Sequence, residues 1–345
     1  MENFFYPISE ELTQLNYHPR SFYAHIYAHT GFFPDLSHID VVLIGLTEAR
    51  GAQHNQSMER GTFEIREKLY RLMKHDTRIK VADLGDLIPG DTLEETYARI
   101  AEVGQRCLEK QLLPVFFGGS HDLDIGQYRA YEGMNKMVSL LTVDAKVDME
   151  EITGEPCAGH TQQIVLHEPN FLFSSAHIAY QRYLNDPDLL MAIEKLNFDL
   201  MRLGELRADI SEVEPLLRQT DLVSFDLCAI QAADAPGVYD AQAFGLTATE
   251  ACQLARFAGS SEKLSSFGLY GYQPYYDDAH NRTAQVAAVM LWYFIDGFYE
   301  REHNLSFDSV DYMKYTVSLD TKGGVLTFIK ASVPTNGGWK FRRRS

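Results

Sequence analysis

Eight short runs rich in apolar and β-branched residues recur along the chain, and amphipathic helical patterns separate most of them. Several runs are apolar at consecutive positions, which is typical of strands that helices cover on both faces. No Pro-, Gly- or Ser-rich linker interrupts the alternation, so it predicts an α/β fold on a mainly parallel sheet of about eight strands. The predicted strands are DVVLIGL (40–46), KVADLG (80–85), PVFFGG (114–119), SLLTVDA (139–145), FLFSSAHIAY (171–180), FDLMRLG (198–204), LVSFDL (222–227) and KLSSFGLYGY (263–272).

The two ends of the chain depart from this alternation. We expect residues 1–39 to form an N-terminal extension that packs on a single domain over residues 40–345. MKYTVSLD (313–320) and VLTFIKAS (325–332) are separated by TKGG and predict a hairpin at the edge of the sheet. The basic tail, Lys340–Arg344, is most simply a solvated chain end.

Composition argues against two classes of partner. The formal charge of −17 disfavours a nucleic-acid binder, because phosphate binding needs a positive surface. The most apolar segment, 283–299, contains Gln285 and Asp296 and is shorter than the roughly 20 apolar residues that span a bilayer. The N-terminus lacks signal-peptide features, and four scattered cysteines form no CxxC pair. We therefore expect a cytoplasmic protein with no membrane or nucleic-acid partner.

Three of the predicted strands end in polar clusters. In open parallel sheets ligands bind beyond the carboxyl ends of the strands, so these side chains are expected to converge. An Asp at a strand end is more often a helix cap, and Asp122 and Asp124 are expected to cap the helix that follows them. The coincidence of three clusters nevertheless indicates a site. The clusters are Ser120-His121-Asp122, Asp144-Ala145-Lys146-Val147-Asp148 and Asp226-Leu227-Cys228.

These clusters resemble the ureohydrolase family, which comprises arginase, agmatinase and formimidoylglutamase. In that family GG-D-H, D-A-H-x-D and S-F-D-x-D stretches together hold two manganese ions. The resemblance implies an arginase-like three-layer fold, a small amidine or guanidine substrate or ligand, and a homo-oligomer. The segment 268–299 is most similar to a formimidoylglutamase-like branch. The matching stretches here are GGSH (118–121), DAKVD (144–148), SFDLC (224–228), APG (235–237), GLTATE (245–250) and RGTFEIREKLY (60–70), within roughly residues 40–300.

The resemblance implies that His121, Asp144, Asp148 and Asp226 bind one metal ion. The second ion would need a histidine and an aspartate at the positions of Lys146 and Cys228. The three carboxylates and the ammonium carry a net charge of −2, which one divalent ion neutralises and two would overshoot. A protonated lysine also has no lone pair to offer. We therefore expect at most one divalent ion, with manganese favoured over zinc or magnesium, or else an ion-free site with protonated carboxylates.

The resemblance further implies hydrolysis of a C–N bond by metal-bound hydroxide. It places His160, Asp148 and Glu250 among the catalytic residues. His160 would pass a proton to the leaving amine, and Glu250 would pair with the amidinium. The alternatives are that His160 lies in a surface turn and that Glu250 only caps a helix together with Thr247.

Two functions fit these residues. The first is a formimidoylglutamase-like hydrolase with one metal ion and reduced or altered activity, whose substrate carboxylates Arg50 or Arg207 would bind. The second is a non-catalytic protein of the same fold that binds a ligand or takes part in assembly. Lys146 favours the second, because an ammonium repels a cationic substrate. Cys228 is a soft metal ligand, a reactive thiolate or a small apolar filler.

Overall fold

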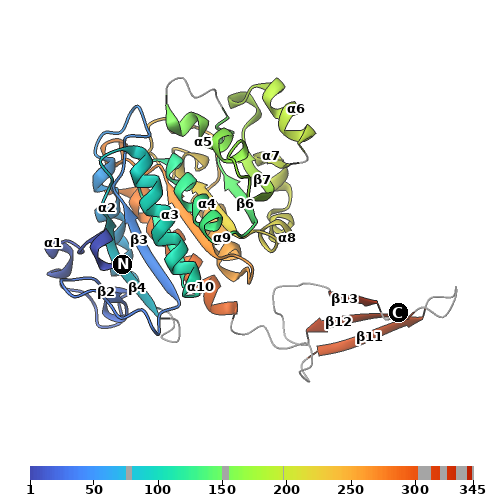
Figure 1. Cartoon of the computed structure of the whole chain (residues 1–345), viewed down its shortest axis with the longest axis horizontal. Helices are drawn as coiled ribbons and strands as arrows, with labels where there is room; N and C mark the ends of the chain where they lie inside the picture. Colours follow the sequence, from blue (N-terminus) through green and yellow to red (C-terminus); the bar gives the residue numbers. More distant parts are fainter. Residues whose placement is uncertain are drawn as a thin grey trace. The chain divides into compact units, whose positions relative to one another are not determined.

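The computed structural model describes residues 1–74, 80–149, 155–196, 198–301, 312–318, 325–331 and 340–343. The chain forms two compact units, Met1–Phe298 and Tyr299–Ser345 (Figure 1). Among the described residues, the first unit contains a ten-stranded sheet with its helices, and the second contains a three-stranded sheet. The boundary at residue 39 and the single domain over 40–345 remain predictions.

All eight predicted strands are present in the large sheet. The strand order is β1-β4-β3-β5-β10-β9-β6-β7-β8, and every neighbouring pair from β4 to β8 is parallel. These eight strands are β3 (Val41–Leu46), β4 (Val81–Leu87), β5 (Leu113–Phe117), β6 (Val138–Val143), β7 (Leu172–Tyr180), β8 (Asp199–Arg202), β9 (Leu222–Asp226) and β10 (Ser266–Tyr270).

The N-terminal extension adds two further strands. β1 (Phe5–Tyr6) pairs antiparallel with β4, and β2 (Tyr27–Ala28) pairs parallel with β4. The sheet is therefore wider than the predicted eight strands, because the extension hydrogen-bonds along the free side of β4.

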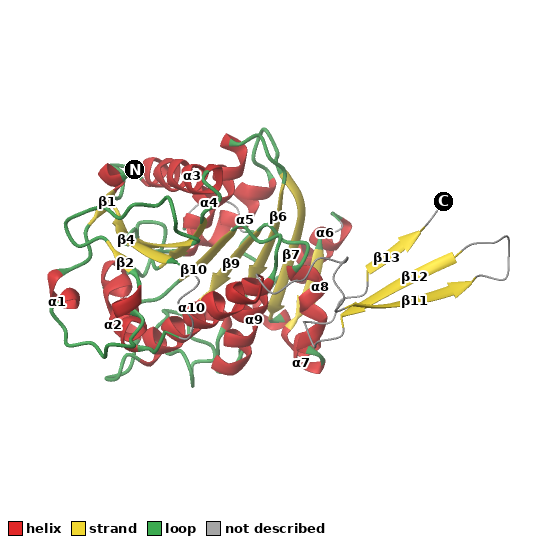
Figure 2. Cartoon of the chain, turned by 90° about the horizontal axis from the view of Figure 1, so that it is seen from below, coloured by secondary structure: helices red, strands yellow, loops and turns green. Residues whose placement is uncertain are grey.

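Helices cover both faces of the sheet, as the apolar strands predict. Figure 2 shows α3 (Leu93–Glu109) and α4 (Asp124–Gly133) on one side, and α9 (Ala248–Ser260) and α10 (Arg282–Glu300) on the other. No helix in the described part of the chain is long and apolar enough to cross a membrane. The other α-helices with described bounds are α1 (Glu10–Thr13), α2 (Gly61–Arg71), α5 (Pro156–Val165), α6 (Pro187–Lys195), α7 (Leu203–Ala208) and α8 (Val213–Leu217).

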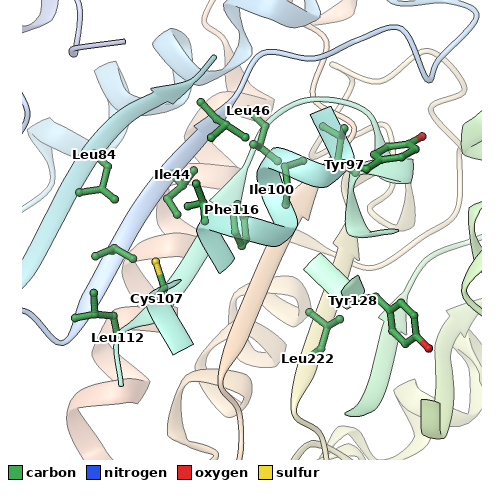
Figure 3. Packing of buried hydrophobic residues seen from close by; sticks show 14 of the residues in the cluster. Ile44, Leu46, Leu84, Tyr97, Ile100, Cys107, Leu112, Phe116, Tyr128 and Leu222 are labelled. Carbon is green, nitrogen blue, oxygen red and sulfur yellow. The ribbon is translucent and has the colours of Figure 1, made fainter. Parts of the chain in front are cut away.

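The core between α3 and the sheet holds the strands in order. Ile44 of β3, Leu84 of β4 and Phe116 of β5 pack with Ile100 and Cys107 of α3 (Figure 3), and all five are fully buried. Burying such an apolar side chain contributes about 1.5–3 kcal/mol, so this layer strongly stabilises the arrangement of the central strands.

A buried ion pair joins α2 to β4. Arg66 Nε and Nη2 donate hydrogen bonds to the two carboxylate oxygens of Asp83 at 2.9 and 3.0 Å, and the Tyr70 hydroxyl donates to Asp83 at 2.8 Å. Arg66 and Asp83 are 2% and 0% exposed. The bidentate geometry satisfies both charges away from water.

The C-terminal hairpin forms, but not where the sequence places it. β11 (Tyr312–Ser318) and β12 (Val325–Ala331) pair antiparallel. β13 (Lys340–Arg343), from the basic tail, pairs with the other side of β12, and the three strands make a sheet of their own. The prediction that the hairpin lies at the edge of the large sheet is therefore wrong. β12 forms its hydrogen bonds with β11 on one side and β13 on the other. The predicted turn at 321–324 lies outside the described residues.

Candidate metal centre

Four neighbouring parallel strands, β5, β10, β9 and β6, bring the polar clusters to the same edge of the sheet. Phe117 of β5, Leu269 of β10, Phe225 of β9 and Val143 of β6 are register partners across the sheet. Asp226 is the last residue of β9 and Asp144 directly follows β6. His121 follows β5 in a short 3-10 helix, His121–Leu123. Because the strands are parallel and in register, their carboxyl ends deliver these side chains to one place.

Two glycines turn the chain sharply before His121. Gly118 and Gly119 have φ of +87° and +70°, a left-handed conformation that side chains disfavour. A Cβ atom would lie 2.7 Å from the Leu46 carbonyl oxygen at Gly118 and 2.4 Å from a Leu123 methyl at Gly119. Both positions therefore require glycine if the loop is to direct His121 over the sheet end.

The clustered side chains have the spacing of ligands around a cation. His121 Nδ1 lies 3.1 Å from Asp144 Oδ2, 3.2 Å from Asp226 Oδ2 and 3.9 Å from Asp148 Oδ2. With bonds of about 2.1 Å, adjacent ligand atoms lie about 3.0 Å apart in an octahedron and about 3.4 Å apart in a tetrahedron. His121, Asp144 and Asp226 are all buried and can offer one ligand atom each within 4.8 Å of one another. The structure thus brings three of the four predicted ligands together, while Asp148 lies within 4.8 Å of His121 and of His160 in a second group.

Hydrogen bonds on the far side of His121 leave its Nδ1 free for an ion. Nε2 lies 2.9 Å from Ser224 Oγ, and the Ser224 hydroxyl donates to Asp124 Oδ2 at 2.8 Å. Since that hydroxyl proton is used, Oγ accepts the Nε2 proton, and the lone pair of the neutral ring is on Nδ1. Nδ1 is buried and has no hydrogen-bond partner. A buried imidazole nitrogen without a partner among three carboxylates fits a divalent ion.

His160 belongs to the same cluster. It lies in α5, is 1% exposed, and so does not occupy the surface turn of the alternative interpretation, which is wrong. Its Nδ1 donates to Asp124 Oδ1 at 2.9 Å, and its Nε2 lies 3.4 Å from Asp148 Oδ2 without a hydrogen-bond partner. Burial lowers the pKa of His160, but Asp124 and then Asp148 outweigh burial and hold that pKa well above its ordinary value.

Neither aspartate that was expected to cap α4 does so. α4 begins at Asp124 with Leu123 as its N-cap and no side-chain capping bond. Asp124 instead accepts hydrogen bonds from His160 and Ser224, while Asp122 accepts them from the Tyr97 hydroxyl and the Cys157 thiol. Both carboxylates are fully buried, so polar groups of the interior take the place of the helix terminus.

Burial, together with repulsion from Asp144, raises the pKa values of two carboxylates in the cluster. Burial and then the Asp144 charge raise the pKa of Asp148 to about 7, and the same two causes raise the pKa of Asp226. Burial would also raise the pKa of Asp144, but the nearby imidazole of His121 prevails and lowers it. Without a cation, the folded protein therefore holds protons in the cluster near neutral pH.

The Lys146 ammonium is paired with Asp240, a residue outside the three clusters. Its Nζ lies 2.5 Å from Asp240 Oδ2, and both side chains are substantially exposed. Only its backbone N–H bonds the cluster, donating to Asp144 Oδ1 at 3.1 Å. The charge count that set this ammonium against a second ion therefore has to include Asp240 as well.

Cys228 is a hydrogen-bond donor to the cluster. Its thiol donates to Asp144 Oδ1 at 2.8 Å, and its backbone N–H donates to Asp226 Oδ1 at 2.6 Å. Burial and the charges of Asp144 and Asp226 hold the pKa of Cys228 well above its ordinary value. The ion-free site therefore contains a neutral thiol and no reactive thiolate at this position.

The remaining predicted residues already have partners within the protein. Glu250 forms the capping box of α9 with Thr247, and its carboxylate accepts hydrogen bonds from Arg207 Nε at 3.1 Å and Nη2 at 3.3 Å. Arg50 binds Glu48 and also donates to the carbonyl oxygens of residues 90 and 91. A substrate group would have to compete with these contacts.

Sequence reasoning missed three polar residues of the site. Asp124 and Ser224 orient the two imidazoles, and His177 of β7 places its Nε2 3.2 Å from the Asp144 backbone oxygen. Burial lowers the pKa of His177 to about 4, so this ring is neutral near physiological pH. The available signal was a histidine between the apolar residues Ala176 and Ile178 of a predicted strand, since a buried polar group must find a partner.

The fold and the cluster define an α/β protein with a candidate divalent-metal centre at the carboxyl edge of a parallel sheet. Residues 39–296 match the Arginase family, and the chain belongs to that family.

Relatives and solved structures agree with the family membership. The formimidoylglutamase of Geobacillus thermodenitrificans is 27% identical over 264 residues, which cover 72% of this chain and 81% of that protein. The formimidoylglutamase of Lysinibacillus sphaericus is 26% identical over 267 residues, covering 72% and 82%. Trypanosoma cruzi formiminoglutamase, solved with Mn2+, has a TM-score of 0.70 at 23% identity and covers 75% of this chain and 93% of its own. Arginase from Bacillus caldovelox has a TM-score of 0.62 at 19% identity, covering 74% and 98%. The ureohydrolase resemblance and its formimidoylglutamase-like character are confirmed.

Proposed function

We propose that this chain uses one divalent ion to hydrolyse a C–N bond of a small linear amidine. The names of its formimidoylglutamase relatives indicate this type of substrate. The observation that carries the proposal is His121 Nδ1, which is buried, lacks a hydrogen-bond partner and lies 3.1–3.2 Å from Asp144 and Asp226. Such an arrangement is costly for folding unless a cation is bound.

His121, Asp144, Asp148 and Asp226 would hold the ion, and Mn2+ suits a set of mainly oxygen ligands. A bound divalent ion lowers the pKa of a water molecule and so supplies a nucleophile near neutral pH. The protein contributes a largely buried cluster, which strengthens electrostatic interactions by excluding water. Its carboxylates would attract a cationic amidinium group.

A second candidate is a non-catalytic protein that binds a ligand in the same pocket. The observation that favours it is Glu250, whose carboxylate is already occupied by Arg207 and Thr247. An amidinium that used Glu250 would have to displace the Arg207 guanidinium. The neutral thiol of Cys228, where the resemblance implies an aspartate of the second metal site, points in the same direction.

Metal content and turnover separate the two candidates. The full chain is purified without chelator, manganese, zinc and magnesium are counted per chain, and the Mn2+-loaded protein is given N-formimidoyl-glutamate while free glutamate is measured. About one ion per chain, with glutamate release that Asp148→Ala abolishes and exposed Asp199→Ala does not, supports hydrolysis. An ion without turnover of linear amidines or guanidines supports the binding protein. No ion after Mn2+ loading refutes a metal-dependent function. We also expect a homo-oligomer, which light scattering would test.

A further inference from the structure

A cavity of about 280 Å³ lies at the ends of β7 and β8, at the sheet edge that also carries the candidate metal centre. Residues 180–183, residues 202–204 and Phe244 line this cavity, which we call the β7–β8 cavity. β6, β7 and β8 are neighbouring parallel strands, and Asp144 directly follows β6. The cavity and the cluster therefore share the edge at which parallel sheets bind their ligands.

The segment that lines the cavity is hydrogen-bonded to residues 144–148, the loop that contains two aspartates of the cluster. The Gln181 backbone N–H donates to the Ala145 carbonyl oxygen at 2.9 Å, and Asn185 Nδ2 donates to the same oxygen at 3.1 Å. Asn185 Oδ1 in turn accepts a hydrogen bond from the Val147 backbone N–H at 2.6 Å. These bonds fix one wall of the cavity directly next to the loop of the cluster.

A buried amide holds two aromatic walls of the cavity in place. Gln181 Nε2 donates to the Phe244 carbonyl oxygen at 2.6 Å, and Gln181 Oε1 accepts a hydrogen bond from the Tyr183 hydroxyl. The rings of Tyr183 and Phe244 are nevertheless largely exposed. Aromatic rings on a fixed backbone offer apolar area to the hydrocarbon part of a small ligand.

Two arginines bring positive charge to the cavity, although the chain has a formal charge of −17. Arg182 is exposed, and within the described part of the chain its guanidinium has no hydrogen bond and no ion pair. Arg202 Nε lies 3.0 Å from Glu205 Oε1, but both side chains are more than half exposed. Such a surface pair is weak, so a ligand can compete with it. Because a guanidinium can donate two parallel hydrogen bonds to a carboxylate, both arginines fit an anionic ligand group.

We propose that the β7–β8 cavity binds the anionic end of the substrate, with Arg182 pairing with its carboxylate and Arg202 assisting. This inference rests on the proposed amidine hydrolysis and names the class of substrate, a linear amidine whose far end carries a carboxylate. It gives Arg182 the role that the sequence suggested for Arg50 or Arg207, whose guanidiniums already bind Glu48 and Glu250.

The cluster and the cavity select opposite charges. The buried carboxylates of the cluster attract a cationic amidinium, whereas the guanidiniums of Arg182 and Arg202 attract an anion. A molecule with one charge of each sign therefore binds in a single direction, with its amidine at the candidate metal centre. Such orientation contributes to rate as well as to affinity.

The first test compares two substrates of the Mn2+-loaded full chain, N-formimidoyl-glutamate and N-propylformamidine, which has the same amidine but no carboxylate. Hydrolysis of the C–N bond releases formamide from both, and formamide is measured. Arg182→Met is expected to raise KM for N-formimidoyl-glutamate at least about tenfold, because it removes a charged hydrogen-bond donor. N-propylformamidine should respond much less, and Arg182→Lys should recover part of the loss. Equal losses for both substrates, or no loss for either, would overturn the proposal.

The matched control is Arg71→Met, which removes the same charge from an exposed arginine that pairs with Glu67 in α2. We expect this variant to hydrolyse both substrates like wild type. A loss as large as that of Arg182→Met would show that any arginine of the surface has the effect, and would refute the assignment.

A second measurement does not depend on turnover. Calorimetric titration of the Mn2+-loaded chain with L-glutamate should show a dissociation constant at least about tenfold higher in Arg182→Met than in Arg71→Met. Such a difference in a protein that releases no formamide would refute the proposed function and leave the anion site intact. Release of formamide, with N-formimidoyl-glutamate and L-glutamate both insensitive to Arg182→Met, would support the proposed function and refute the anion site.

Discussion

Replacing Asp148 by asparagine should stabilise or destabilise the protein depending on whether an ion is present. Burial and Asp144 raise the pKa of Asp148 to about 7 in the ion-free fold, whereas an unfolded aspartate has a pKa of about 3.9. The folded state therefore binds the proton more tightly, and this contribution to stability is lost as the pH rises from about 4 to above 7.

The size of the effect follows from these two pKa values. Their difference corresponds to roughly 4 kcal/mol of stability lost by the ion-free wild type over the whole pH range, and to roughly 2–3 kcal/mol between pH 5 and pH 8. The asparagine of Asp148→Asn cannot ionise, so the variant does not lose this stability. In EDTA, the free energy of unfolding of the variant minus that of wild type should therefore rise by roughly 2–3 kcal/mol from pH 5 to pH 8.

With Mn2+ bound, wild type should instead be more stable than Asp148→Asn. An ion that binds only the folded state adds about 2.7 kcal/mol when its concentration is a hundred times the dissociation constant, and Asp148→Asn forfeits much of this by losing a ligand. Urea unfolding followed by circular dichroism, at both pH values and with either EDTA or Mn2+, measures all four conditions. The matched control, Asp199→Asn, changes the same charge on an exposed residue. Parallel behaviour of variant and control would refute the reasoning.

Three further predictions concern single contacts. Arg66→Met leaves the buried Asp83 without its cation and should lower the free energy of unfolding by about 3–5 kcal/mol in urea titrations; a loss below 1 kcal/mol would contradict a structural role for the pair. Cys228 should react with iodoacetamide far more slowly in the native ion-free protein than in urea, because its thiol has a raised pKa, and mass spectrometry would reveal equal rates if this is incorrect. Lys146→His combined with Cys228→Asp restores the donors that the family resemblance implies and should raise the manganese content from about one ion to about two per chain, with an unchanged content as the contrary result.

The central sheet was predictable because its strands are buried on both faces. Runs such as residues 40–46 and 114–119 are apolar at consecutive positions, and the capping box at Thr247 marks the start of α9. β1 and β2 were not predictable, because two residues carry no periodic pattern. Which sheet the C-terminal hairpin belongs to depends on the further strand that pairs with β12. That strand is β13, which the basic tail forms and which the sequence did not predict.

The gathering of His121, Asp144 and Asp226 was predictable because each lies at or after the end of a strand that the pattern identifies. Their assignment as metal ligands came from the family resemblance and stays a prediction. Their orientation was not predictable. The Ser224–Asp124 and His121–Ser224 bonds join residues 100 and 103 positions apart, and the direction of the Lys146 ammonium depends on Asp240, 94 positions away. Local sequence contains no record of such contacts, so Asp124 was interpreted as a cap and Lys146 as part of the cluster.

The electrostatic argument about substrate charge changes once these contacts are known. Lys146 is paired with Asp240, and Asp124 adds a buried carboxylate next to Asp144, Asp148 and Asp226. Four carboxylates and one divalent ion leave a net negative charge, whether His160 is neutral or protonated. The pocket should therefore attract a cationic amidinium group, contrary to the repulsion expected from a lysine within the cluster. Because Glu250 is paired with Arg207, this attraction has to come from the cluster itself. The affinity of the ion-loaded protein for a cationic amidine should then fall as salt screens the interaction.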